Sequence, residues 1–209
     1  MTEEKPDLDA AYALKTPDDS VRLYRDWAQD YDSNFAKGRN YQLHNHVARA
    51  FAQAGGAGPV LDVGGGTGLV AEALAEHGVT PVDGLDISAE MLKIAEDKGV
   101  YRATFTDDLT RALSMPDGSY AGVVSAGTFT HGHVGPEAFD ELLRVSRGGA
   151  VFALSVNAGV YTDRGFDAKL AGLGAAITAP DLQEVAIYGA GTDPAHAEDR
   201  ALVVVFRKR

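Results

Sequence analysis

The alternation of short apolar runs with helical segments is the feature that most constrains the fold of this chain. Runs of strand length occur at residues 59–63, 80–88, 100–106, 120–127 and 150–157. The segments between most of them carry apolar residues at three- and four-residue steps, as amphipathic helices do. Short connections between such elements favour a largely parallel sheet with helices on both faces. The sequence therefore predicts a doubly wound α/β domain.

The two ends of the chain depart from this alternation. Two late apolar runs, residues 182–189 and 200–208, have no convincing helix between them, so we expect them to pair antiparallel. The N-terminal 19 residues are rich in acids and contain two prolines, which predicts a flexible arm. Residues 20–55 are helical in pattern, and residues 58–209 form the predicted core. Because no linker or repeat interrupts them, we expect one domain over residues 20–209.

Composition excludes several classes of function. The formal net charge is -11, and the longest basic cluster is the terminal "RKR", so no nucleic-acid partner is expected. The chain has no cysteine, which excludes disulfides and thiolate chemistry. It shows neither a signal-peptide pattern nor an apolar run near the roughly 20 residues that span a bilayer. These observations predict a cytoplasmic protein without a membrane partner.

The stretch "VLDVGGGTG" at residues 60–68 predicts a strand that enters a glycine-rich ligand loop. The dinucleotide fingerprint G-x-G-x-x-G/A fails when it starts at Gly64 and passes when it starts at Gly66, where Ala71 takes the last position. A nicotinamide cofactor therefore stays open as an alternative. However, Asp62 would oppose a pyrophosphate, and the loop offers no Lys or Arg to offset phosphate charge. A cationic ligand suits the loop better.

S-adenosylmethionine fits these requirements, because it carries a sulfonium, an ammonium, a carboxylate and a nucleoside but no phosphate. The glycines allow the backbone of Gly64–Leu69 to approach its methionine part, and Asp62 is placed to meet its ammonium. Asp86, which ends the second strand, is expected to accept hydrogen bonds from the ribose hydroxyls. The loop residues that are expected to contact the cofactor are Gly64, Gly66, Gly68 and Leu69. The adenine ring is expected to be bound by the Asp108 carboxylate and the Leu109 backbone and to lie between Ile87 and Met91. Carboxylates at the ends of successive parallel strands converge in one crevice.

These motifs resemble those of the class I S-adenosylmethionine-dependent methyltransferases. "VLDVGGGTG", "VDGLDISAEML", "DDL" and "ELLRVSRGGAVFALSVN" are similar to motifs I, II, III and post-IV/V of that family. "YRDWAQDYD" and "AGTFTHGHVGPEAFDELLRV" resemble the methyltransferase-like 27 group, also called the Williams-Beuren syndrome region 27 type. The resemblance implies a seven-strand Rossmann-like sheet whose last strand is antiparallel, with residues 20–55 as a helical lid.

The resemblance also implies roles for residues outside the glycine loop. Aromatic residues of the lid, Tyr24, Trp27 and Tyr31, would cover the methionine part, with Tyr41 as a weaker substrate-side candidate. Ser125 and Gly127 would lie beside the cofactor. Thr128, Phe129, His131 and His133 would face the substrate, as would Asn157 and Arg164, the latter as a clamp for an anionic group. His131 and His133 are the candidates for a general base. A metal on the histidines lacks a supporting acid, so none is expected.

The predicted reaction is direct in-line displacement of the methyl group from sulfur by an acceptor, with S-adenosylhomocysteine as the product. Positioning supplies most of the catalysis, since the cofactor arrives activated. The acidic surface favours a small-molecule acceptor. Two alternatives remain: a binding protein that holds S-adenosylmethionine without catalysis, and an NAD-dependent oxidoreductase. The sequence is compatible with a monomer or a homodimer.

Overall fold

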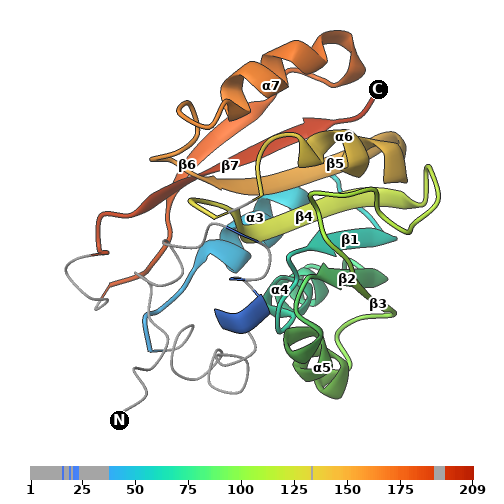
Figure 1. The fold of residues 1–209 in the computed structure, drawn as a ribbon, viewed down its shortest axis with the longest axis vertical. Coiled ribbons are helices and arrows are strands. Elements are labelled where there is room, and N and C mark those ends of the chain that lie inside the picture. Colours follow the sequence, from blue (N-terminus) through green and yellow to red (C-terminus); the bar gives the residue numbers. More distant parts are fainter. Residues whose placement is uncertain (1–15, 17–18, 20, 24–37, 133, 191–195) are drawn as a thin grey trace.

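A computed structural model describes residues 16, 19, 21–23, 38–132, 134–190 and 196–209, and these form a sheet flanked by helices (Figure 1). The strands are β1 (Val60–Val63), β2 (Val82–Asp86), β3 (Thr104–Thr106), β4 (Tyr120–Phe129), β5 (Ser146–Asn157), β6 (Asp181–Ala186) and β7 (Arg200–Arg207). They follow the order β3-β2-β1-β4-β5-β7-β6. Strands β1 to β5 are parallel, and β7 pairs antiparallel with both β5 and β6. The predicted seven-strand sheet with an antiparallel last strand is confirmed.

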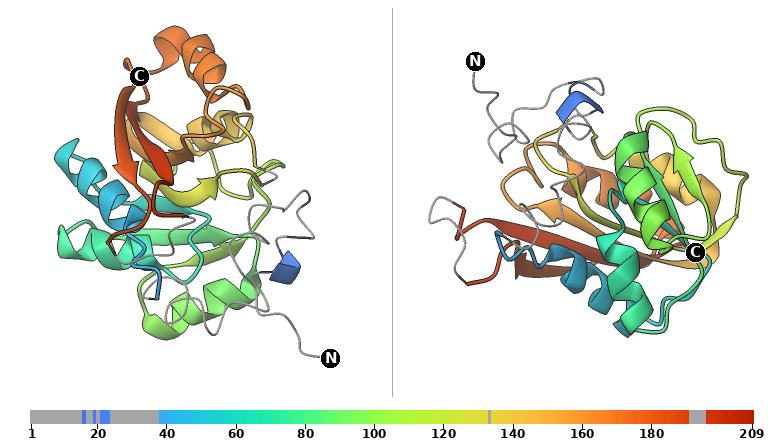
Figure 2. Two further views of the ribbon diagram at one scale, coloured as in Figure 1. Left: turned by 90° about the vertical axis from the view of Figure 1, so that its left-hand side faces the viewer. Right: turned by 90° about the horizontal axis from the view of Figure 1, so that it is seen from below.

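Helices cover both faces of this sheet (Figure 2). They are α3 (Leu43–Gln53), α4 (Leu69–Glu76), α5 (Ala89–Lys98), α6 (Ala138–Val145), α7 (Phe166–Leu173) and the short 3₁₀ helix η2 (Gly174–Ala176). Helices α3 and α4 share one apolar core with the sheet, whereas α6 and α7 share a second core on the other side. Helix α5 lies beside α4 below β2 and β3 in Figure 1. This is the doubly wound arrangement that the alternation predicted.

Successive side chains of β1 alternate between the two apolar cores, because neighbouring residues of a strand point to opposite faces of the sheet. Val60 packs in the core with α3 and α4, and Leu61 packs in the core with α6 and α7. Asp62 therefore returns to the α3 and α4 face, where its side chain is fully buried. A carboxylate in this position is costly without partners. Its surroundings consequently decide what the glycine loop is able to bind.

Helix α5 has a local capping residue at each of its two ends. Ser88 is its N-cap, and the Ser88 hydroxyl accepts a hydrogen bond of 3.3 Å from the Met91 amide. Gly99 ends the helix in the left-handed conformation with φ 69°. The Ser88 cap fixes the start of α5 three residues after Asp86, and therefore fixes the turn that follows this carboxylate.

The elements differ from the predicted ranges in three places. Strand β3 is shorter than predicted and begins at Thr104, while β5 starts four residues early at Ser146. Helix α7 was not predicted, because only Phe166 and Leu170 of its eight residues are buried. The predicted arm and most of the predicted lid lie outside the described residues. Within residues 20–55, which are helical in sequence pattern, the structure describes the helix α3.

Candidate functional site

The site is built around the glycine loop between β1 and α4. Gly64, Gly66 and Gly68 all have positive φ, at 64°, 52° and 91°, so the loop needs glycine at these three positions. The amide of Gly65 donates to the carbonyl of Leu85 on β2, at 2.9 Å. The loop is thereby tied to the neighbouring strand end, which delivers Asp86 to the same place.

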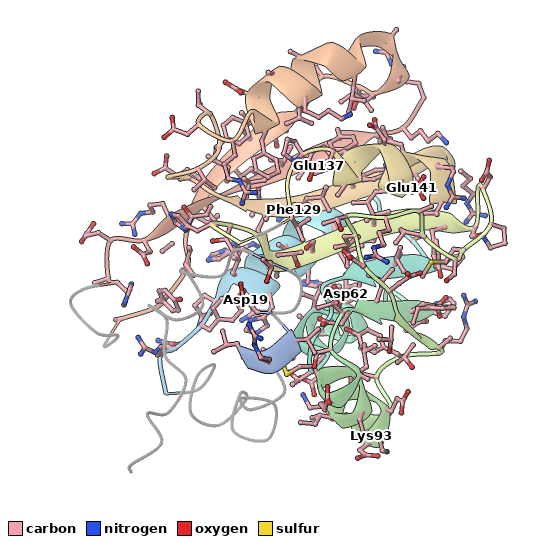
Figure 3. The ribbon with its side chains drawn as sticks, viewed as in Figure 1. Asp19, Asp62, Lys93, Phe129, Glu137 and Glu141 are labelled. Carbon is pink, nitrogen blue, oxygen red and sulfur yellow. The ribbon has the colours of Figure 1, made fainter. Side chains whose placement is uncertain are left out.

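Asp62 lies at the base of this loop (Figure 3) with its carboxylate only half satisfied. Its Oδ2 accepts a hydrogen bond of 2.7 Å from the hydroxyl of Tyr101. Its Oδ1 is buried and has no hydrogen-bond partner among the described residues. Burial raises the pKa of Asp62 to about 7, with a further rise from Asp86, although the Tyr101 hydrogen bond opposes both. A buried, half-paired carboxylate is poised to receive a cationic donor.

Asp86 faces the same loop from the end of β2. Its Oδ2 accepts from the amide of Gly66 and its Oδ1 from the amide of Ser88, both at 2.8 Å. Burial raises the pKa of Asp86, whereas the backbone hydrogen bonds from Ser88, Gly66 and Ile87 lower it. Each carboxylate oxygen retains a second lone pair. Asp86 therefore holds the loop in shape and still offers acceptors to a ligand.

Strand β4 meets the loop through two hydroxyl groups. Ser125 and Thr128 both donate to the carbonyl of Val63, at 2.7 and 3.0 Å. A side chain at Gly64 would overlap the Thr128 hydroxyl, so the close approach requires glycine. Thr128, predicted to face substrate, thus also supports the cofactor loop. The predicted neighbours Ser125 and Thr128 are brought together with the loop.

Tyr41 reaches the end of β4 from the N-terminal side of the chain. It is buried, pairs with Tyr188 in an isolated bridge, and stacks on His44 with ring centroids 5.5 Å apart. Its hydroxyl lies 3.0 Å from the position that a Cβ at Gly127 would take. The structure therefore brings the predicted residues Tyr41 and Gly127 into one region.

The segment after β3 carries the predicted adenine contacts. Both the amide and the hydroxyl of Thr110 donate to Asp108 Oδ1 at 2.8 Å, so this carboxylate shapes its own turn. Leu109 and Met91 are buried, and Ile87 is partly exposed. Asp107 accepts a 3.0 Å hydrogen bond from the Ser114 amide, which folds the segment back on itself.

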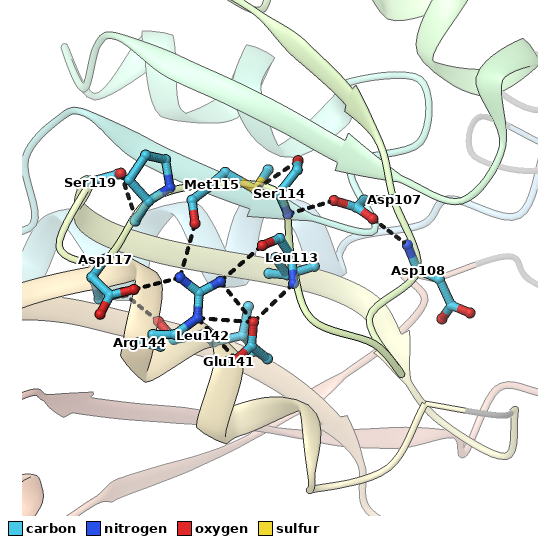
Figure 4. A network of polar contacts seen from close by, with 12 residues as sticks. Asp107, Asp108, Leu113, Ser114, Met115, Asp117, Ser119, Glu141, Leu142 and Arg144 are labelled. Carbon is cyan, nitrogen blue, oxygen red and sulfur yellow. Dashed lines mark hydrogen bonds and ion pairs between the residues drawn. The ribbon is translucent and has the colours of Figure 1, made fainter.

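Arg144 on α6 holds the far end of that segment (Figure 4). Its guanidinium donates to the carbonyls of Leu113 and Met115 at 2.9 and 3.0 Å. It also pairs with Asp117 at 2.7 Å and with Glu141 at 2.8 Å. Glu141 in turn accepts from the Leu113 amide at 2.9 Å. One arginine thus anchors the whole connection between β3 and β4.

The predicted acceptor side gathers around the loop after β4. Arg164 donates to the carbonyl of Thr130 at 2.6 Å and to the carbonyl of Gly132. His131 is exposed between these two anchored residues. Asn157, which ends β5, accepts from the Gly159 amide at 2.9 Å. Arg164 therefore fixes the backbone that presents His131.

The structure gives Phe129 a role that differs from the prediction. Its side chain is 1% exposed and packs edge-on against Phe139 and Phe166, inside the core with α6 and α7. Strand β4 continues to Phe129, and the alternation that places Val123 in this core places the Phe129 ring there as well. Phe129 is a packing residue rather than a substrate contact. Tyr24, Trp27, Tyr31 and His133 lie outside the described residues.

Sequence reasoning gave no role to Tyr101 or to Arg39. Tyr101, just before β3, hydrogen-bonds Asp62 from 39 positions away, and no local pattern marks that contact. Arg39 has a buried Nη1 without a hydrogen-bond partner among the described residues. A buried donor of this kind is costly when unpaired, which makes Arg39 a candidate for an anionic group of a ligand.

The described residues show neither a metal site nor a membrane span. These residues contain no group of three His, Asp or Glu side chains arranged to hold a metal ion. Each helix in the described ranges is too short or too polar to cross a bilayer.

The comparison with known sequences finds the same kind of protein that the motifs resemble. A family described as "Methyltransferase domain" matches residues 60–149, which include the glycine loop and Asp86. Methyltransferase-like protein 27 from Homo sapiens is 30% identical over 156 residues, or 72% of this chain. The alignment spans 63% of the human protein, so the chain covers less than two thirds of that relative's length.

Solved structures share the fold at low sequence identity. An S-adenosylmethionine-dependent methyltransferase from Thermotoga maritima is 16% identical, with a TM-score of 0.63 over 90% of this chain and 99% of its own. The [4+2]-cyclase SpnF is 16% identical, with a TM-score of 0.67 over 93% of this chain and 97% of its own. The order of the strands and the glycine loop agree with the matched domain and with the relatives. The chain has the fold of the class I S-adenosylmethionine-dependent methyltransferases and residues 60–149 match a methyltransferase domain, which together imply S-adenosylmethionine as the cofactor.

Proposed function

We propose that this chain transfers a methyl group from S-adenosylmethionine to a small-molecule acceptor by direct in-line displacement. The observation that carries the proposal is the buried Oδ1 of Asp62, which has no partner among the described residues. The ammonium of the cofactor would supply the missing donor at the base of the glycine loop. A charge-assisted hydrogen bond there stabilises both groups.

The same carboxylate argues against a dinucleotide. A pyrophosphate on the loop would bring negative charge toward Asp62, whose pKa the nearby charge of Asp86 already raises. The loop sequence from Gly64 to Gly68 carries no cation to offset that charge. An ammonium has the opposite sign and relieves the repulsion.

The remaining cofactor contacts would come from residues at the other strand ends. The free lone pairs of Asp86 would accept from the ribose hydroxyls, and the turn of Asp108 and Leu109 would hold adenine against Met91. Arg39 would pair its buried Nη1 with the carboxylate of the methionine part. Each end of the cofactor would thus have a protein group of complementary charge or hydrogen-bonding capacity.

The acceptor would approach from the loop after β4. The cofactor supplies an activated methyl group, so the protein has to align the acceptor and exclude water. Arg164 anchors the backbone around His131, and His131 is the candidate to take a proton from the acceptor. The net charge of -11 favours a small acceptor over a nucleic acid.

Catalysis must be tested separately from binding, because this fold also occurs in a protein named as a [4+2]-cyclase. The experiment is to measure S-adenosylhomocysteine formation with a panel of small acceptors that contains hydroxyl compounds, amines, thiols and carbon acids. The parent chain should turn over at least one class, and Asp86→Ala should lose that activity together with cofactor affinity. Asp140→Ala is the matched control, since Asp140 lies on α6 in an exposed pair with Lys169. Binding without turnover across the panel would favour the non-catalytic alternative.

A further inference from the structure

Tyr101 makes a contact that the methyltransferase motifs do not include. From the approach to β3, its hydroxyl donates to Asp62 Oδ2 at 2.7 Å. The same oxygen lies 3.1 Å from the carbonyl oxygen of Gly65 in the glycine loop. One phenol therefore spans the end of β1 and the loop that follows it.

We propose that Tyr101 is a positioning residue that presents Asp62 to the ammonium group of S-adenosylmethionine. This inference rests on the proposed function. Since Oδ2 is occupied by Tyr101, the carboxylate plane is fixed and Oδ1 is the oxygen left for the ligand. A phenol held in place by packing also preorganises Asp62 before the cofactor arrives, which lowers the cost of binding.

The space around Tyr101 is made by two glycines, Gly84 and Gly65, neither of which has a positive φ that would itself require glycine. A Cβ at Gly84 on β2 would lie 2.5 Å from ring atom Cε2 of Tyr101. A Cβ at Gly65 would overlap the Tyr101 hydroxyl. Gly84 thus admits the ring, and Gly65 admits the hydroxyl. Two missing side chains on different elements leave room for one tyrosine, which supports a specific placement of the phenol.

The charges around the phenol keep it a hydrogen-bond donor. Burial raises the pKa of Tyr101 well above its ordinary value, and the carboxylates of Asp62, Asp86 and Glu72 raise it further. The hydroxyl accordingly keeps its proton while Asp62 ionises. Because its hydrogen bond favours the ionised carboxylate, removal of the hydroxyl should make Asp62 harder to ionise.

The test compares two ligands that differ only at the methionine end. S-adenosylhomocysteine carries the ammonium, whereas 5′-methylthioadenosine keeps the nucleoside and thioether without it. In Tyr101→Phe, affinity for S-adenosylhomocysteine at pH 7 should fall about tenfold, the scale of one hydrogen bond to a charged group. Affinity for 5′-methylthioadenosine should stay within about twofold. Equal losses for both ligands would overturn the proposal, as would no loss for either.

Tyr120→Phe is the matched control for the loss of a buried phenol. The Tyr120 hydroxyl donates to the buried carboxylate of Asp83 at 3.1 Å, on the opposite face of the sheet from Asp62. This variant should bind both ligands as the parent does. If it weakened S-adenosylhomocysteine as much as Tyr101→Phe, the effect would be one of general stability and the proposal would fail.

The pH profile gives a readout that a purely structural role would not move. Ligand affinity should rise with pH as Asp62 ionises, and should fall above about pH 8 as the ligand ammonium loses its proton. Tyr101→Phe should shift the acid limb to higher pH and leave the alkaline limb in place. Titration of Asp86 would appear in the 5′-methylthioadenosine profile, which separates the two carboxylates. An unmoved acid limb would contradict the proposal.

A second variant pair tests the contact without relying on Tyr101→Phe alone. Gly65→Ala should weaken S-adenosylhomocysteine, because its Cβ would overlap the Tyr101 hydroxyl. In the double variant with Tyr101→Phe, the nearest ring atom to that Cβ is Cζ at 3.2 Å, so part of the affinity should return. Strictly additive losses would overturn the inference. Failure of the parent chain to bind S-adenosylhomocysteine would instead refute the proposed function.

Discussion

Gly84 lies directly opposite Asp62 in the parallel ladder between β2 and β1, and both positions face the side of the sheet covered by α3 and α4. Because Gly84 has no side chain, the Tyr101 ring can lie against this position and reach the Asp62 carboxylate. The register of two strands therefore decides how the binding carboxylate is supported. This relationship links the fold to the chemistry of the site.

Gly84→Ala should disturb both stability and binding. Its Cβ would meet the Tyr101 ring at 2.5 Å, and overpacking of this kind costs about 1–3 kcal/mol. We expect a lower free energy of unfolding in urea and weaker S-adenosylhomocysteine binding. Gly172→Ala in α7 is the control: nothing lies within 4 Å of its Cβ, so it should stabilise by about 0.5–1 kcal/mol. Equal behaviour of the two variants would contradict this account of the packing.

Asp62→Asn should separate binding from stability. In the folded protein the pKa of Asp62 is raised from 3.8 to about 7. The contribution of Asp62 to the free energy of unfolding is therefore most favourable below pH 4, where the carboxyl is protonated, and it is lost as the pH rises through 7. The neutral amide avoids that loss. We expect the variant to be more stable than the parent at pH 8, by on the order of a few kcal/mol, with a smaller gain at pH 5.

The same variant should bind S-adenosylhomocysteine poorly, because an amide cannot pair with the ammonium as a carboxylate does. Urea denaturation at pH 5 and pH 8 checks the predicted gain in stability, and ligand titration at pH 7.5 checks the predicted loss of binding. A variant that is less stable than the parent at pH 8 would show that Asp62 is already well compensated in the free protein.

Arg144→Met should loosen the connection between β3 and β4. It removes hydrogen bonds to the carbonyls of Leu113 and Met115 and leaves the partly buried Glu141 without its main cation. We expect a lower free energy of unfolding, because these hydrogen bonds are lost. Amide hydrogen exchange should rise in residues 109–117 and stay unchanged in β1.

A surface pair provides the control for Arg144. Lys93 and Asp97 form an exposed i,i+4 pair on α5, so Lys93→Met should leave the free energy of unfolding nearly unchanged. If exchange in residues 109–117 were the same in Arg144→Met and the parent, the network in Figure 4 would not be what holds this segment.

Arg39→Met should weaken ligand binding without loss of stability. The buried Nη1 of Arg39 has no hydrogen-bond partner among the described residues, so removing it costs the free protein nothing at that atom. Affinity for S-adenosylhomocysteine should fall about tenfold, while 5′-methylthioadenosine, which lacks the carboxylate, should bind as before. Unchanged affinity for both ligands would remove Arg39 from the site.

The fold was largely predictable because its signals are local. Ser88 and Gly99 mark the two ends of α5 through hydrogen bonding and a positive φ within a few residues. The glycine loop and the carboxylate of Asp86 follow strands whose apolar character is visible in the sequence. Helix α7 escaped prediction because only two buried residues, Phe166 and Leu170, mark its inner face.

The details of the site depended on contacts that the sequence does not display. Tyr101 meets Asp62 because of the registers of β1 with β2 and of β2 with β3, which bring together residues 39 positions apart. Phe129 was misplaced because β4 continues two residues beyond its predicted end at Gly127, so the ring follows the alternation of the strand into the core. Strand register and irregularity are set by tertiary packing.

Calorimetric titration with S-adenosylmethionine, S-adenosylhomocysteine and NADH at pH 7.5 tests the central claim most directly. The buried half-paired carboxylate of Asp62 predicts micromolar binding of both adenosyl compounds and no binding of NADH. Binding of NADH alone, or of neither adenosyl compound, would contradict the assignment of the glycine loop to S-adenosylmethionine.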